Sequence, residues 1–319
     1  MPRPVSPRTD FPPRTACSAR RVSYFDFTWP SSTEVLVSGA VRDDTTDADG
    51  VTTMGEPLEI AVHAEDLVVT RLELEPPIVD VDTLIGDSLV IGFRSRARAL
   101  ISRDPELEGT PVGLLLEDLP AGTFVSHYAL ELRMQRAGKS RPLGRAAWTQ
   151  ADLCSGWRTD GMMMLAVRAG QRLPYLDLPP APFQLAGDDG PALPPLPSEG
   201  MRRHRRIDVI QRDGEWVVDA WFRDSYVDST GLKGSLHEYT IDATIGTGDH
   251  VIRAINAVAH ALPWHECPAA VGFVGMLTGE RIDALRTQTS KTLRGIESCT
   301  HLNNMLRSLA DVPYLGALV

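Results

Sequence analysis

Two stretches of the chain alternate apolar and polar residues on both sides of a polar tip. The first spans residues 20–43 and reads RRVSYFDFTWPSSTEVLVSGAVRD, and the second spans residues 205–224 and reads RRIDVIQRDGEWVVDAWFRD. A period of two is typical of a strand with one buried face, so each stretch predicts an antiparallel β-hairpin. In the second stretch Asp213-Gly214 supplies the two-residue turn.

The two hairpins also share residues in the same order, and further matches follow them along the chain. SHYALELR at residues 126–133 aligns with THLNNMLR at residues 300–307 without a gap. The other matching segments are 20–22 with 205–207, 41–43 with 222–224, and 55–60 with 234–239. We interpret these matches as an internal duplication of one α+β unit. The alternative is a chance resemblance between hairpins of similar composition.

The expected fold class is therefore α+β, with two related units and a pseudo-two-fold relation between them. Each unit is expected to be an antiparallel β-sheet with helices packed on one face. A segment rich in proline and glycine separates the two units and marks the domain boundary. The predicted divisions are a disordered tail (1–18), a degenerate first unit (19–170), a linker (171–200) and a second unit with the site (201–319).

Charge and cysteine content limit the partners and the compartment. The formal net charge of -10 argues against nucleic acid or an anionic membrane surface as the partner. No apolar run approaches the roughly 18 residues of a membrane span, and the N-terminal residues lack the apolar core of a secretory signal. Four cysteines without such a signal indicate free thiols in a reducing compartment. We therefore expect a cytoplasmic protein.

The second unit contains two imidazoles and two thiols, and only one of the four, His301, has a counterpart in the first unit, at His127. These residues are His237, Cys267, Cys299 and His301. The positions of His237 and Cys299 correspond to Leu58 and Val125 in the first unit. Imidazole and thiolate bind zinc or iron, or form a nucleophile–base pair. The sequence therefore predicts that the chemistry lies in the second unit.

Two assignments of these residues remain open. In one, all four bind a metal ion, zinc or iron. In the other, Cys299 is a nucleophile beside His301, at a helix N-terminus that lowers the pKa of the thiol. Glu238 is a candidate catalytic base in either case. Taken singly, each cysteine is also compatible with a small apolar residue of the core.

Three helices are predicted after the last strand, at residues 269–277, 282–293 and 299–310, with Thr300 as the N-cap of the third. Cys154 belongs to a segment that neither unit explains and that is expected to pack near the site. The chain contains no dinucleotide-binding glycine motif, phosphate-binding loop, serine-hydrolase elbow or HExxH motif.

At these positions the chain resembles a bacterial family filed as domain of unknown function 2889. The resemblance covers about residues 200–312. The matching motifs are Arg205-Arg206, Arg223-Asp224, Gly234 to His237, Cys267-Pro268 and Cys299 to Leu302. The chain departs from the family at Glu297-Ser298, where a glycine usually precedes the cysteine. This resemblance implies no activity.

A more distant resemblance is to the fold of iron–sulfur-cluster assembly scaffolds of the NifU/SufE type. The residues that carry it are Cys267 to Ala270, Gly279 to Asp283 and Cys299 to His301, with His237 in place of the first cysteine of the scaffold. The resemblance implies a metal or cluster site, but it does not transfer a function.

These observations favour a small-molecule metabolic enzyme, a hydrolase or lyase, with a zinc, iron or activated-cysteine site. The alternative is a non-enzymatic metal or iron–sulfur carrier that docks on a protein acceptor, and a structural binding module is a third hypothesis. A homodimer is compatible with all three. A deep apolar pocket beside the four residues would favour the enzyme, and a shallow exposed site would favour the carrier.

Overall fold

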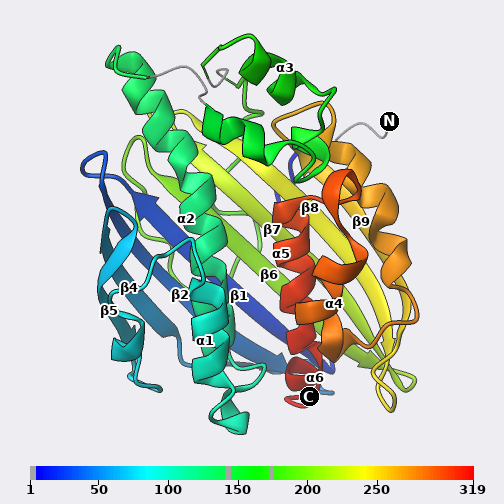
Figure 1. The fold of residues 1–319 in the computed structure, drawn as a ribbon. Helices are drawn as coiled ribbons and strands as arrows, with labels where there is room; N and C mark the ends of the chain where they lie inside the picture. Colours follow the sequence, from blue (N-terminus) through cyan, green and yellow to red (C-terminus); the bar gives the residue numbers. More distant parts are fainter. Residues whose placement is uncertain (1–4, 141–144, 173–175) are drawn as a thin grey trace.

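A nine-stranded antiparallel sheet extends across the molecule (Figure 1). The computed structural model describes residues 5–140, 145–172 and 176–319, and all strand statements refer to these residues. The strands are β1 (Ser18–Thr28), β2 (Glu34–Thr46), β3 (Thr52–Met54), β4 (Leu58–Glu65), β5 (Val68–Glu75), β6 (Met201–Arg212), β7 (Glu215–Val227), β8 (Lys233–Gly246) and β9 (Ile252–Ala261). Their order is β5-β4-β2-β1-β6-β7-β8-β9, with β3 paired to β2. The predicted α+β class is confirmed.

The two predicted units contribute one half of the sheet each, and the halves join between β1 and β6. These strands pair antiparallel from Ser18 opposite Ile210 to Phe27 opposite Met201. The sequence predicted one sheet in each unit, whereas the structure has a single continuous sheet. If the units were separate, β1 and β6 would each expose a row of unpaired backbone groups, and their pairing removes both edges.

The predicted turn of the second hairpin is confirmed. Asp213 and Gly214 both have positive φ, at 52° and 78°, and the flanking residues Arg212 and Glu215 are paired. Two central residues with positive φ form the turn whose twist matches that of the strands.

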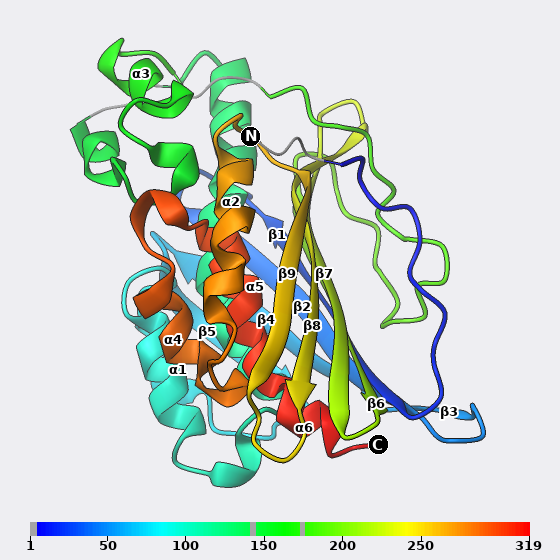
Figure 2. The same ribbon diagram turned by 90° about the vertical axis from the view of Figure 1, so that its right-hand side faces the viewer.

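Helices cover one side of the sheet, which we call the helix face (Figure 2). The α-helices are α1 (Phe93–Ile101), α2 (Pro111–Arg136), α3 (Met162–Arg168), α4 (Leu285–Thr292), α5 (Thr300–Ser308) and α6 (Val312–Gly316). The 3₁₀ helices are η1 (Asp82–Leu84), η2 (Pro105–Leu107), η3 (Arg145–Gln150), η4 (Ser155–Trp157), η5 (Cys267–Leu277), η6 (Ile282–Ala284), η7 (Gly295–Glu297) and η8 (Leu309–Asp311). One apolar core joins α1 and α2 to the first half of the sheet, and another joins η5, α4, α5 and α6 to the second half.

The helices after β9 differ in detail from the prediction. The segment expected to be a helix at 269–277 forms the 3₁₀ helix η5, and it contains Gly272 and Gly275, which disfavour an α-helix. The segments expected at 282–293 and 299–310 are each split into an α-helix and a 3₁₀ turn. Cys299, with extended φ and ψ of -132° and 126°, occupies the N-cap position predicted for Thr300.

The opposite side of the sheet, which we call the loop face, is covered by residues 5–17 and 176–200 (Figure 2). The backbone N–H of Val5 donates to the carbonyl of Ala259, and that of Phe11 donates to the carbonyl of Ala186. The side chain of Phe11 is buried against Trp221. Residues 5–17 therefore differ from the predicted disordered tail. Their order follows from the buried ionic groups of this face, which need backbone and side-chain partners.

Within the described residues, no helix has both the length and the apolar character needed to cross a membrane.

Candidate metal site

Two neighbouring strands contribute the first two residues of the site. Asp224 on β7 lies directly opposite His237 on β8, and the register between the two strands shifts beside this pair, because Ser225 lies opposite Ser235 and Leu236 of β8 is passed over. Residues directly opposite in a ladder point to the same side of the sheet, which here is the helix face. The Oδ2 atom of Asp224 lies 3.2 Å from Nδ1 of His237. Bulges of this kind often lie beside functional sites because they redirect side chains.

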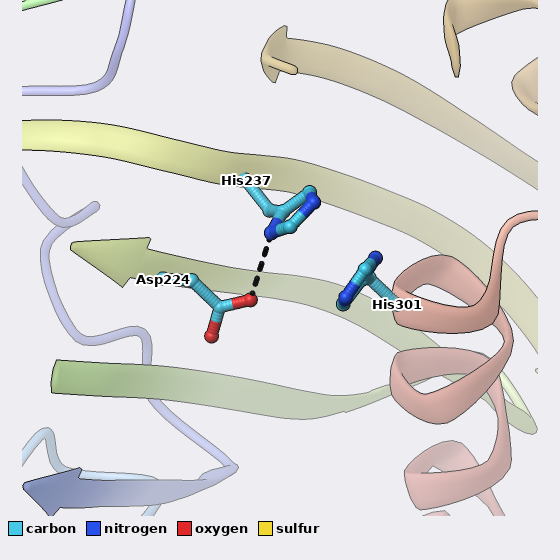
Figure 3. Close-up of side chains that lie close together, drawn as sticks. All are labelled: Asp224, His237 and His301. Carbon is cyan, nitrogen blue, oxygen red and sulfur yellow. Dashed lines mark hydrogen bonds and ion pairs between the residues drawn. The ribbon is translucent and has the colours of Figure 1, made fainter. Parts of the chain in front are cut away.

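The third residue comes from the first turn of α5. His301 stacks on His237 with 3.7 Å between ring centroids and 23° between ring planes. Figure 3 shows the two imidazoles side by side, one from the strand and one from the helix, with Asp224 beside them. The extended conformation of Cys299 starts α5 at a point where its first turn faces the sheet.

Asp224, His237 and His301 each offer a ligand atom, and these atoms all lie within 4.8 Å of one another. Asp224 and His237 are buried, and His301 is partly exposed. Two imidazoles and one carboxylate form a ligand set used by zinc and by non-haem iron, with positions left open for water or substrate. The geometry can therefore accept a divalent ion.

The charges around the three residues favour ligand forms. Burial raises the pKa of Asp224, but the guanidinium of Arg203 outweighs it and holds that pKa well below its usual value. Arg203 donates from Nε to Oδ1 at 2.7 Å and from Nη2 to Oδ2 at 3.0 Å. Burial and the neighbouring His237 lower the pKa of His301 well below its usual value. An ionised carboxylate and a neutral imidazole are the forms that bind metal.

The thiol of Cys299 lies beside the site but outside the three-residue set. Its Sγ atom is 3.8 Å from Nδ1 of His301, and the hydroxyl of Tyr239 donates to it at 3.3 Å. Burial raises the pKa of Cys299, although Tyr239 and backbone N–H groups of α5 act in the opposite direction. A raised pKa favours the neutral thiol, which is a poor nucleophile and a poor ligand. The predicted roles of Cys299 remain predictions.

Cys267 and Cys154 lie near Cys299, and Cys267 does not belong to the three-residue set either. Cys267 starts η5, and a Cβ on Gly156 would come within 2.7 Å of its sulfur. The loop of Cys154 is joined to that of Cys299 by a hydrogen bond from the N–H of Ser155 to the carbonyl of Ser298, at 2.8 Å. Burial raises the pKa of both thiols. The structure thus brings the predicted His237 and His301 together and leaves the cysteines at the side.

Glu238 lies on the loop face, away from the imidazoles. Its carboxylate accepts hydrogen bonds from Nε1 of Trp221 at 2.8 Å and from Nη2 of Arg223 at 2.9 Å. The backbone N–H of Arg8 donates to it as well, at 2.9 Å. Successive residues of a strand point to opposite faces, so a neighbour of His237 in sequence cannot share its site. The predicted catalytic role of Glu238 does not agree with this placement.

Asp224 is the site residue that the sequence prediction missed. It appears in the sequence only as part of the Arg-Asp pair at the end of a hairpin. The signal that could have found it is the pairing of β7 with β8, since the residue opposite His237 has to face the same side. Aligning the sequence of β7 with that of β8 in antiparallel order would place Asp224 opposite His237.

A cavity of about 260 Å³ lies beside His301. The cavity is bordered by α1, α2, the segment from η3 to η4, and the start of α5. The lining residues are Val90, Arg94, Pro120, Ala121, Phe124, Gln150, Leu153, Thr300 and His301. Because Phe124 and Leu153 are 52% and 46% exposed, the cavity opens to solvent. The cavity gives a small molecule access to the imidazole of His301.

Comparisons with known proteins match one segment of the chain to a family model and give no named relative. No curated protein and no solved structure matches the chain. All three residues of the candidate metal site lie inside the segment that matches a family, whereas Arg94 and Phe124 of the cavity lie outside it. That segment, residues 201–315, matches the model of the family described as protein of unknown function (DUF2889).

Proposed function

We propose that the protein is a cytoplasmic enzyme of small-molecule metabolism that binds zinc or iron through Asp224, His237 and His301. The observation that carries the proposal is the convergence of their ligand atoms within 4.8 Å, with His301 also on the wall of a cavity. Catalytic metal sites use three protein ligands and keep a position for water or substrate.

The residues around the three ligands support this role. Arg203 keeps Asp224 ionised, and Asn304 of α5 accepts a hydrogen bond from Nη1 of Arg203 at 3.2 Å, which ties the helix to the carboxylate. Residues that form hydrogen bonds to a metal ligand and fix its orientation in this way are typical of metal sites. A bound divalent ion would supply a water of lowered pKa or polarise a substrate oxygen, as hydrolases and lyases require.

The carrier hypothesis is the alternative, and the burial of the site argues against it. Asp224 and His237 are buried, and access is through a cavity of about 260 Å³. An ion handed to a protein acceptor has to be reached by the ligands of that acceptor, which a small cavity hinders. A cavity with apolar walls and a few polar groups is instead typical of small-molecule sites.

The test is a metal titration of protein dialysed against a chelator, with Co²⁺ as the spectroscopic probe and Zn²⁺ as competitor. We expect one Co²⁺ per chain with visible absorption bands, and we expect His301→Gln to weaken binding by at least about 100-fold, since it removes a direct ligand. The matched control is His127→Gln, because His127 lies on α2 beside Trp29 and outside the site.

The absence of stoichiometric binding, or binding that survives His301→Gln, would refute the metal assignment. A loaded protein that delivers its ion to a second protein faster than to a free chelator of equal affinity would favour the carrier.

We further propose that the two halves of the sheet derive from a duplication. Two buried ion pairs across β1 and β6 support it, because they are exchanged by a two-fold rotation. Arg20 pairs with Asp208 at 2.6 Å, and Arg202 pairs with Asp26 at 2.6 Å. This symmetry relates Arg20 to Arg202, three residues before the Arg205 to which the sequence comparison matched it.

A further inference from the structure

The cavity beside His301 contains a cationic side chain that has no acidic partner in the part of the chain that the structure describes. Arg94, in the first turn of α1, reaches only the backbone carbonyl of Glu117, with Nε and Nη2 both 3.4 Å from that oxygen. No ion pair of Arg94 is found among the described residues. A guanidinium has five N–H donors, so most of its capacity is unused here.

Several arginines share the carboxylate nearest to Arg94. The carboxylate of Glu117 is already shared by Arg98 at 3.4 Å and Arg286 at 3.1 Å. Arg307 of α5 likewise has no ion pair among the described residues, and its buried Nε has no hydrogen-bond partner. Burial, together with repulsion from Arg94, lowers the pKa of Arg307 to about 10. Burial also lowers the pKa of Arg94. Both side chains are partly buried. Removing a cation from water without a counter-ion is costly, and an anion would relieve that cost.

The remaining walls of the cavity are mostly apolar. They are formed by Val90, Pro120, Ala121, Phe124 and Leu153. Next to Val90, Ile91 is 80% exposed, which extends the apolar surface outside the cavity. A single cation in an apolar cavity suits a ligand with one anionic group and an apolar body.

We propose that this cavity binds a small carboxylic acid with an apolar body, held by its carboxylate on Arg94 and by its body against Phe124 and Leu153. A guanidinium fork matches the two oxygens of a carboxylate in one plane. His301 lines the same cavity, so the bound acid lies beside the candidate metal site. The inference that the acid is a substrate rests on the proposed metal enzyme. The binding of the acid to Arg94 does not require the metal.

The experiment measures binding to chelator-treated protein by calorimetry, with phenylacetate and octanoate as probes and their neutral amides as matched controls. At least one acid is expected to bind, with its amide at least about tenfold weaker because the charged hydrogen bonds are lost. Arg94→Gln should weaken the acid at least about tenfold. The control is Arg96→Gln on the same helix, since Arg96 is exposed and pairs with Asp87.

A second measurement separates a binding role from a structural one. Removal of a partly buried cation that has no ion pair should leave the melting temperature of the ligand-free protein unchanged or higher, whereas removal of a structural arginine lowers it. The inference is overturned if neither acid binds, if acids and amides bind equally, if Arg94→Gln leaves acid binding unchanged, or if acids bind only after metal is added. Failure of the metal titration alone would remove the proposed enzyme and leave the carboxylate site standing.

Discussion

The two faces of the sheet both bury charged side chains, but they use them differently. On the loop face, Arg202 holds both oxygens of Asp26, at 2.6 and 2.7 Å, and Arg223 holds both oxygens of Glu238, at 2.9 and 3.0 Å. On the helix face, Arg203 holds Asp224 in the same way. The helix face additionally contains His301, which lines a cavity, and two arginines, Arg94 and Arg307, that form no ion pair among the described residues.

This difference distinguishes a structural ionic network from a functional one. A buried pair with all its hydrogen bonds made fixes two strands relative to each other. A buried ionic group left incomplete beside a cavity costs stability, and it is a candidate binding or catalytic group. We therefore expect substitutions on the loop face to affect mainly stability, and those around Asp224 and Arg94 to affect mainly binding.

The largest expected effect is on folding, at the ion pairs between β1 and β6. Arg202→Met should lower the free energy of unfolding by about 3–5 kcal/mol, because it leaves the buried carboxylate of Asp26 unpaired. Arg20→Met should lower it by less, because Arg206 still pairs with Asp208. Urea denaturation measures them, with Arg71→Met in an exposed pair as the control that should cause no measurable change. Equal losses in the two variants would contradict the compensating role of Arg206.

The next largest effect is on metal affinity, which should depend on the helix face and not on the loop face. Asp224→Asn should weaken zinc binding by about 100-fold, because it removes an anionic ligand, whereas Glu238→Gln should change it by less than about threefold. Both acids are buried on neighbouring strands, so general damage to the fold would affect both equally. Competition with a chromophoric chelator gives the two affinities. Equal weakening by the two substitutions would contradict the assignment.

The smallest of these effects concerns pH. Burial lowers the pKa of His204 on the loop face to about 3, and Arg202 and Arg223 add to the shift by repulsion. His204 becomes protonated near pH 6.5 in the unfolded chain but only near pH 3 in the folded chain. The free energy of unfolding therefore decreases as the pH falls from 6.5 towards 3. The expected loss between pH 6.5 and pH 5 is about 2 kcal/mol.

Urea denaturation at the two pH values, with His204→Gln as the comparison, measures this contribution. The variant should lose less stability than the wild type on acidification. The same pH dependence in both proteins would show that another group is responsible.

Local patterns in the sequence were sufficient for several features. Alternation of apolar and polar residues predicted the strands, Asp213-Gly214 predicted the turn, and the residues His237 and His301 were predicted to belong to one site. Each of these depends on neighbours in the chain or on residue type, and such signals are present before the chain folds. Metal binding itself is a proposal that rests on the residues' geometry.

Other features depend on contacts between distant segments, and only the tertiary structure decided them. The pairing of β1 with β6 made one sheet of two, and residues 5–17 became ordered by covering its loop face. The pairing of β7 with β8 placed Asp224 beside His237 and turned Glu238 to the other side. Packing of α1 and α2 beside α5 brought Arg94 and His301 to one cavity. Periodicity specifies which residues share a face, but the choice of neighbouring strands and helices is set by the burial of the whole chain.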